Sequence, residues 1–130
     1  MVVDTSAVLA VIFEEAEAAV FAEILAGSET TLCSSVSLLE AGIVIKARKG
    51  RAAEKDFRDF LALARIKVVE FSASQSAIAM QAWRKYGKGN HKAGLNLGDC
   101  CAYALSKDLR QPLLYKGNDF SRTDVAAVRY

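Results

Sequence analysis

The stretch VVDTSAVLA (residues 2–10) sets the pattern that decides the fold. Two apolar β-branched residues run into Asp4, and an apolar segment with helical spacing follows. This change predicts a short buried strand over residues 1–4 that passes directly into a helix. Asp4 would cap that helix, because a side-chain oxygen at this point accepts hydrogen bonds from free backbone N–H groups. Thr5 or Ser6 could cap the helix instead, which would leave Asp4 free for chemistry.

Short apolar strands alternate with helices along the rest of the chain. Apolar runs without a polar face favour a parallel sheet that is covered by helices on both sides. We therefore expect an α/β fold, a three-layer α/β/α sandwich with a short, mainly parallel central sheet. The expected strands are 1–4, 30–34, 66–71, 112–115 and an edge strand in VAAVRY at 125–130, and the expected helices cover 7–13, 15–26, 35–48, 57–64, 72–87 and 99–109.

Length and composition indicate one compact domain over residues 1–130, since the chain is 52% hydrophobic and has a single proline. No apolar run approaches the roughly 20 residues of a membrane span, and no basic segment precedes an apolar one at the N-terminus. We expect a cytoplasmic protein without a membrane partner. Three cysteines, two of them adjacent, suit reduced thiols. One histidine and no C-x-x-C pair argue against a zinc site.

Four acids stand where a parallel sheet would gather them, and each also has a local explanation. Asp4 and Asp119 follow expected strands, whereas Glu40 and Asp99 lie near expected helix starts. Glu40 completes a capping-box pattern with Ser37. Asp99 suits the first turn of a helix, and Asp119 suits a turn. Functional groups of such folds collect beyond the carboxyl ends of the strands, so all four acids would lie along one edge.

A cation would explain this gathering of acids better than the local roles do. On a helix, Glu40 shares a face with Val36, Ile43 and Val44, and a buried carboxylate without a partner is costly. Clustered carboxylates also raise one another's pKa unless a cation lies among them. Oxygen-only ligation suits Mg²⁺ or Mn²⁺, which can polarise a phosphodiester and activate an attacking water.

Four segments carry a resemblance to a known family. They are VVDTSA at the start, SVSLLEAG around Glu40, LNLGDCCAYALS around Asp99 and PLLYKGNDF near the end. Together, in this order, they resemble PIN-domain ribonucleases, and specifically VapC-type toxins of toxin–antitoxin pairs. The resemblance covers nearly the whole chain. Many PIN domains carry an acid where this chain has Gly117, and here the acid comes two residues later, as Asp119.

The resemblance implies an Mg²⁺-dependent endoribonuclease, a hydrolase in which Mn²⁺ can substitute. Asp4 and Asp99 would ligate the metal, and Glu40 would hold or deprotonate the metal-bound water. Asp119 would support a water or a second ion, or the site would rely on three acids. In-line attack would leave a 5′-phosphate and a 3′-hydroxyl. Thr5 or Ser6 would hydrogen-bond an acid or the scissile phosphate.

Partners follow from the surface pattern and from the resemblance. The stretch RKYGKGNHKAG contains Lys88, His91 and Lys92, which read equally well as a phosphate-tracking loop or as solvated surface. The helix around LLEAGIVIK is apolar almost all round, so it is either fully buried or covered by another protein. VapC-like toxins imply a cognate antitoxin, a homodimer and toxin–antitoxin hetero-oligomers. As a toxin, the protein would inhibit translation by cutting RNA.

Other functions remain open at this stage. A catalytically silent PIN-like module would bind RNA or a protein without cleaving. A haloacid-dehalogenase-type phosphatase needs a second Asp two residues after the first, where this chain has Ser6, and a receiver domain needs an Asp where the strand at 66–71 ends in Glu70 and Phe71. A phosphate-binding G-x-x-x-x-G-K-[ST] loop is absent from the sequence.

Overall fold

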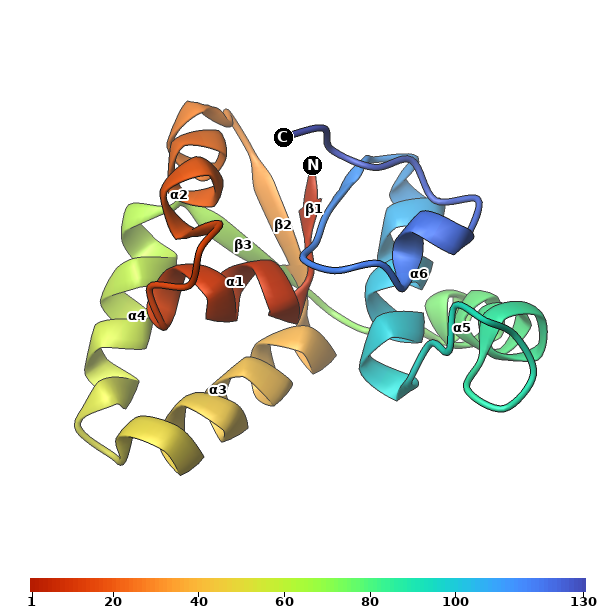
Figure 1. Cartoon of the computed structure of the whole chain (residues 1–130), viewed down its shortest axis with the longest axis horizontal. Helices are drawn as coiled ribbons and strands as arrows, with labels where there is room; N and C mark the ends of the chain where they lie inside the picture. Colours follow the sequence, from red (N-terminus) through yellow and green to blue (C-terminus); the bar gives the residue numbers. More distant parts are fainter.

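The computed structural model describes all 130 residues and has a four-stranded parallel sheet at its centre. The strand order is β3-β2-β1-β4, so the strand nearest the N-terminus lies between β2 and β4. This arrangement confirms the expected α/β class with a short parallel sheet (Figure 1). The strands are β1 (Val2–Val3), β2 (Thr31–Ser34), β3 (Ile66–Val69) and β4 (Leu113–Leu114).

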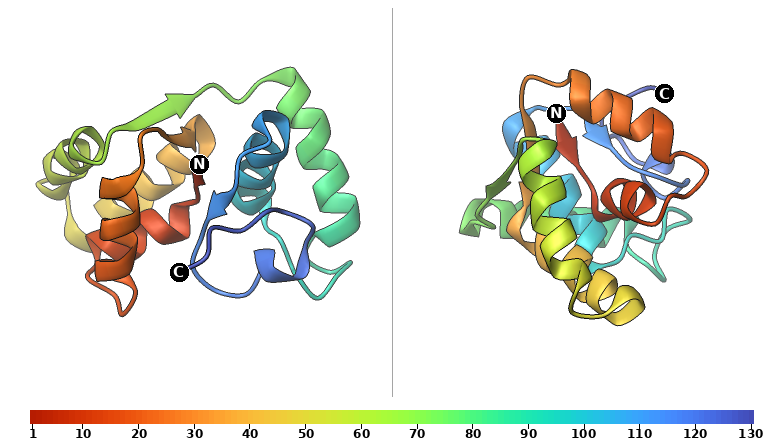
Figure 2. Two further views of the ribbon diagram at one scale, coloured as in Figure 1. Left: turned by 90° about the horizontal axis from the view of Figure 1, so that it is seen from above. Right: turned by 90° about the vertical axis from the view of Figure 1, so that its left-hand side faces the viewer.

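Helices cover both faces of the sheet, as expected. The first four helices lie on one side and the last two on the other (Figures 1 and 2). No helix is both long and apolar enough to cross a membrane. The helices are α1 (Thr5–Ile12), α2 (Ala18–Gly27), α3 (Ser35–Lys49), α4 (Ala53–Leu63), α5 (Ala73–Tyr86) and α6 (Leu97–Leu109), followed by the short 3₁₀ helix η1 (Phe120–Arg122).

The neighbouring strands β1 and β4 divide the core into two halves because successive strand residues point to opposite faces. Val2 and Leu113 pack with α5 and α6, whereas Val3 and Leu114 pack with the helices of the other side. All four side chains are fully buried. Each half of the core contains 14 buried residues, so both faces of this short sheet are held by apolar packing.

Helix α3 starts at residue 35, as expected, but its cap differs from the proposed one, and helix α6 starts earlier than expected. Helix α3 begins one residue after Ser34, whose hydroxyl accepts from the N–H of Val36, so Ser34 and not Ser37 is the cap. The proposed capping box of Ser37 and Glu40 was therefore wrong. Helix α6 begins two residues before the expected Asp99, because Asn96 provides the cap.

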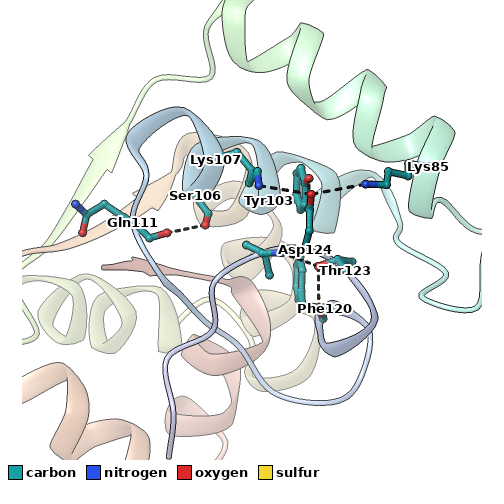
Figure 3. A network of polar contacts seen from close by, with 9 residues as sticks. Lys85, Tyr103, Ser106, Lys107, Gln111, Phe120, Thr123 and Asp124 are labelled. Atoms are coloured by element: carbon teal, nitrogen blue, oxygen red, sulfur yellow. Dashed lines mark hydrogen bonds and ion pairs between the residues drawn. The ribbon is translucent and has the colours of Figure 1, made fainter.

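The C-terminal segment is not the edge strand that its apolar pattern predicted. It follows β4 through two backbone hydrogen bonds of Leu113, with Ala126 and Val128, but forms only one bridge, at Ala127. A polar network around Asp124 anchors the segment to α5 and α6 (Figure 3). Side-chain contacts therefore fix this segment where strand pairing does not.

Large apolar residues differ in their burial. Phe21 is fully buried and meets Tyr130 edge-to-face, so it belongs to the core. Trp83 is partly exposed. Cys100 and Cys101 are buried free thiols. Leu39 and Ile43 on α3 are 64% and 60% exposed, so this helix is not fully buried.

Candidate active site

The carboxyl ends of three neighbouring strands form the edge at which the acids meet. Asp4 follows β1 directly, α3 with Glu40 follows β2 directly, and the segment that leads to Asp119 follows β4. Helix α6 contacts α3 and both central strands, which brings the start of α6 and Asp99 to the same region. The topology thus gathers residues that are up to 115 positions apart in the sequence.

Asp4 is the most buried of these acids, with only 3% of its surface exposed. It caps α1 itself, so the alternative cap by Thr5 or Ser6 is not what the structure shows. Ser6 donates to Asp4 Oδ2 twice, from its backbone N–H at 2.9 Å and from its hydroxyl at 2.6 Å. Burial raises the pKa of Asp4, the Ser6 hydrogen bonds lower it, and the charge of Glu40 raises it further.

The position of the Glu40 carboxylate depends on a hydrogen bond from Thr5 and on the space left by Gly98. The Thr5 hydroxyl contacts Glu40 Oε2 at 2.8 Å and the backbone oxygen of Ser37 at 3.2 Å. A Cβ atom added at Gly98 would collide with the carboxylate of Glu40. Helix α6 therefore approaches α3 at a point where glycine leaves room for the Glu40 carboxylate in its present position.

Asp99 belongs to a capping box at the start of α6. Its Oδ2 accepts from the N–H of Asn96 at 2.8 Å, and its own N–H donates to Asn96 Oδ1 at 2.9 Å. Burial raises the pKa of Asp99 to about 7, opposed by the Asn96 hydrogen bond and assisted by the charges of three acids. In decreasing order of effect, these acids are Asp4, Asp119 and Glu40.

Asp119 lies at the start of η1 and makes no capping hydrogen bond there. Its side chain is exposed, in contrast to that of Asp4. Because its charge raises the pKa of Asp99, Asp119 acts electrostatically on the same region in spite of its shifted place in the sequence. The charges of the other three predicted acids therefore all act on Asp99.

No lysine, arginine or histidine forms an ion pair with any of these four acids. Their side chains also do not converge closely enough for three of them to hold one ion as they stand. The donor chemistry nevertheless fits Mg²⁺ or Mn²⁺, since every group is a carboxylate. The hydrogen bonds to Asp4 and Asp99 engage Oδ2 and leave Oδ1 of each acid available. The side chains would have to move for three of them to hold one ion.

The residues proposed to contact RNA fall into two groups. The hydroxyls of Thr5 and Ser6 bond Glu40 and Asp4, as one of their two expected roles required. Lys88, His91 and Lys92 are exposed on the loop between α5 and α6. Within that loop, His91 Nδ1 accepts from the N–H of Ala93, and its ring meets Tyr86 edge-to-face. A role for this loop in RNA binding stays a prediction.

Sequence reasoning missed three supporting residues of the site. Gly98 was visible as the glycine directly before Asp99, and Asn96 as an Asx residue three positions ahead of an acid, which is a capping pattern. Lys116 gave no such signal, because its backbone N–H donates to the Ser6 hydroxyl across 110 residues of sequence. That contact depends on the pairing of β4 with β1.

Comparison with known proteins agrees with these observations. The family described as PIN domain matches residues 1–126. Among curated proteins, VapC ribonuclease Mb0640 of Mycobacterium bovis is 43% identical over 128 residues, covering 98% of both chains. A protein named Ribonuclease VapC from Mycolicibacterium smegmatis is 44% identical and covers 98% of this chain and 99% of its own.

Solved structures share the fold at lower identity. VapC20 of Mycobacterium tuberculosis, described as a Sarcin-Ricin loop cleaving toxin, has a TM-score of 0.80 at 17% identity, over 99% of this chain and 98% of that chain. A toxin–antitoxin complex from Klebsiella pneumoniae has a TM-score of 0.74 at 18% identity, over 99% and 97% of the two chains. The family match and the relatives confirm the resemblance seen in the sequence: this chain belongs to the PIN-domain family, and its relatives there are VapC ribonucleases.

Proposed function

We propose that this protein is an Mg²⁺-dependent endoribonuclease and the toxin of a toxin–antitoxin pair. The observation that carries the proposal is the group of four acids, Asp99 and the three whose charges act on it, none of which forms an ion pair with a cationic side chain. Buried and crowded carboxylates are costly, and a divalent cation would remove that cost. Relatives at 43–44% identity are named ribonucleases, which supports RNA as the substrate.

Each acid has a distinct role in the proposed reaction. Asp4 and Asp99 would hold the ion through their available Oδ1 atoms, while Ser6 and Asn96 fix the orientation of the carboxylates. When bound, Mg²⁺ supplies positive charge that polarises the phosphodiester and acidifies an attacking water. Glu40, oriented by the Thr5 hydroxyl, accepts the proton of that water. Asp119 would support a water or a second ion, and in-line attack would leave a 5′-phosphate and a 3′-hydroxyl.

RNA would approach this acidic edge with help from basic residues elsewhere on the surface. The loop with Lys88, His91 and Lys92 leads directly into the capping box of Asp99. Exposed lysines on a glycine-containing loop can follow a phosphate backbone without reading bases. We propose that this loop contributes electrostatic affinity for RNA, whereas the four acids carry the chemistry.

Protein partners would cover the apolar surface beside the acids. A hollow next to Glu40 is lined by exposed Leu39, Ile43 and Leu97, which are 64%, 60% and 73% exposed. Apolar clusters of this kind mark protein contacts. We propose that the partners are a cognate antitoxin and a second copy of this chain, which form a homodimer and toxin–antitoxin hetero-oligomers. The protein would act in the cytoplasm, where it would inhibit translation by cutting RNA. Two structural neighbours are themselves described as a toxin–antitoxin complex and as VapBC2 bound to DNA.

An RNA cleavage assay tests the proposal and separates it from the alternative of a silent binding module. We expect cleavage with Mg²⁺, loss of cleavage with chelator, and loss in Asp4→Asn and Asp99→Asn. Asp56→Asn, an exposed acid on α4, is the matched control and should cleave normally. RNA binding without cleavage under every metal condition would favour the silent module, and cleavage that ignores chelator and both site variants would contradict the metal-dependent mechanism.

A further inference from the structure

Lys116 lies between the candidate active site and the connection from α1 to α2. Its ammonium contacts Glu15 Oε2 at 2.6 Å and Glu17 Oε2 at 2.8 Å. The first contact is also a hydrogen bond, whereas the second has ion-pair distance only, because Glu17 Oε2 receives no hydrogen bond of normal geometry. All three side chains are partly buried, at 30–34% exposure. Two acids therefore hold one lysine.

The backbone of Lys116 contacts the candidate active site through Ser6. The N–H of Lys116 donates to the Ser6 hydroxyl oxygen at 2.9 Å, and that hydroxyl donates to Asp4 Oδ2 at 2.6 Å. Since the Ser6 oxygen accepts from Lys116, its own hydrogen is directed at the carboxylate. A continuous chain of polar contacts thus runs from Glu15 and Glu17 through Lys116 and Ser6 to Asp4.

We propose that Lys116 is a positioning residue, which fixes Asp4 for metal binding through Ser6 and is itself fixed by Glu15 and Glu17. This inference rests on the proposed metal-dependent function. The backbone next to Lys116 needs such an anchor, because β4 ends at Leu114 and the exposed Gly117 has φ +96°. Hydrogen-bonded partners of metal ligands commonly change metal affinity by about 10–100-fold when removed.

A competing role for Lys116 is direct contact with substrate phosphate. Its two acidic partners argue against this role, since they already neutralise the ammonium at contact distance. The two roles predict different effects of a variant that removes the acidic partners of Lys116. Loss of Glu15 and Glu17 charge would weaken metal binding if Lys116 positions Asp4, but would strengthen RNA binding if Lys116 binds phosphate.

Mn²⁺ titration followed by electron paramagnetic resonance tests the proposal on the full chain, with KM and kcat for RNA measured in parallel. We expect Lys116→Met to weaken Mn²⁺ binding by about 3–10-fold, less than a direct ligand partner such as Ser6→Ala. The double variant Glu15→Gln/Glu17→Gln should weaken it in the same direction, and Lys116→Arg should restore most of the affinity. Lys55→Met, which removes an exposed 2.6 Å ion pair with Asp59 on α4, is the matched control and should bind as the wild type does.

Three results would overturn the inference. Mn²⁺ binding by Lys116→Met equal to that of the wild type would remove the positioning role and leave the proposed function intact. A lower KM for RNA in Glu15→Gln/Glu17→Gln, with a higher KM in Lys116→Met, would assign Lys116 to substrate phosphate. Absence of Mn²⁺ binding by the wild type itself would overturn the proposed function and this inference with it.

Discussion

Two aspartates of this protein, Asp124 and Asp99, have opposite surroundings. Asp124 accepts a hydrogen bond from Tyr103 at 2.6 Å and lies 3.6 Å from the ammonium groups of both Lys85 and Lys107 (Figure 3). The Tyr103 hydrogen bond and then the lysines hold the pKa of Asp124 below its usual value. Asp99 forms no ion pair with a cationic side chain, and burial raises its pKa to about 7.

The difference separates a structural acid from a functional one. Around Asp124 the fold supplies its own positive charges and anchors the C-terminal segment. Around Asp99 the fold gathers three more acids, and no lysine, arginine or histidine forms an ion pair with any of the four. Perturbed groups of this kind concentrate at functional sites, where the stability that the fold gives up is recovered on binding a ligand.

The largest effect is expected on activity when the buried acid is neutralised. Asp4→Asn keeps the size of the side chain but removes the charge that would hold the ion, so RNA cleavage should fall at least about 100-fold. Asp124→Asn should cleave at a rate close to that of the wild type, because Asp124 serves the C-terminal anchor. Single-turnover cleavage rates of the two variants test this prediction. Equal losses of activity would contradict the view that Asp4 is catalytic and Asp124 structural.

A smaller effect on activity is expected where Gly98 of α6 meets Glu40 of α3. Gly98→Ala places a methyl group against the Glu40 carboxylate, which must move. Cleavage should fall about 10–100-fold, since small displacements of a catalytic group are costly. Gly27→Ala, where an added Cβ meets nothing within 4 Å, is the matched control. Thermal unfolding should change little in either variant, and an intact rate in Gly98→Ala would mean that Glu40 need not occupy its present position.

Local sequence patterns predicted the acids and most elements, but not the contacts between distant segments. Asp4 could be predicted because a strand pattern meets a helix pattern there, and Asp99 because it stands at the start of a helix pattern. The contact of Gly98 with Glu40 and that of Lys116 with Ser6 join separate elements, and no local propensity encodes them. The prediction of a C-terminal edge strand was wrong for a related reason: residues 125–130 have strand propensity, but they meet β4 at a single bridge, and the Asp124 contacts with distant helices anchor the segment.

The pH dependence of stability should differ at the two aspartates. Because the pKa of Asp99 is raised on folding from 3.8 to about 7, its ionised form destabilises the metal-free fold above pH 7, and the cost fades as pH falls toward 4. One pKa unit corresponds to about 1.4 kcal/mol, and partial exposure reduces the effect. Metal-free Asp99→Asn should therefore be more stable than the wild type by roughly 1–2 kcal/mol at pH 8 and by little at pH 5. Urea unfolding at both pH values measures this, and a less stable Asp99→Asn at pH 8 would contradict it.

The smallest effect is expected at the paired aspartate, with the opposite sign. The pKa of Asp124 is lowered on folding, so its charge stabilises the protein above pH 4 and the contribution is lost as pH falls below that. Asp124→Asn should destabilise the fold by about 1 kcal/mol or less at pH 7, because the lysine pairs are exposed. Urea unfolding of Asp124→Asn measures this effect. A gain in stability would mean that Asp124, like Asp99, destabilises the fold in its charged form.

The most direct test of the account is the response of unfolding to Mg²⁺ at pH 8. The wild type should unfold at a higher temperature as Mg²⁺ is added, because the ion binds the folded carboxylates, and Asp124→Asn should show the same increase. Asp4→Asn should show little or none. A wild type that does not respond to Mg²⁺, or an Asp4→Asn variant that responds equally, would contradict the claim that these acids are arranged for a cation.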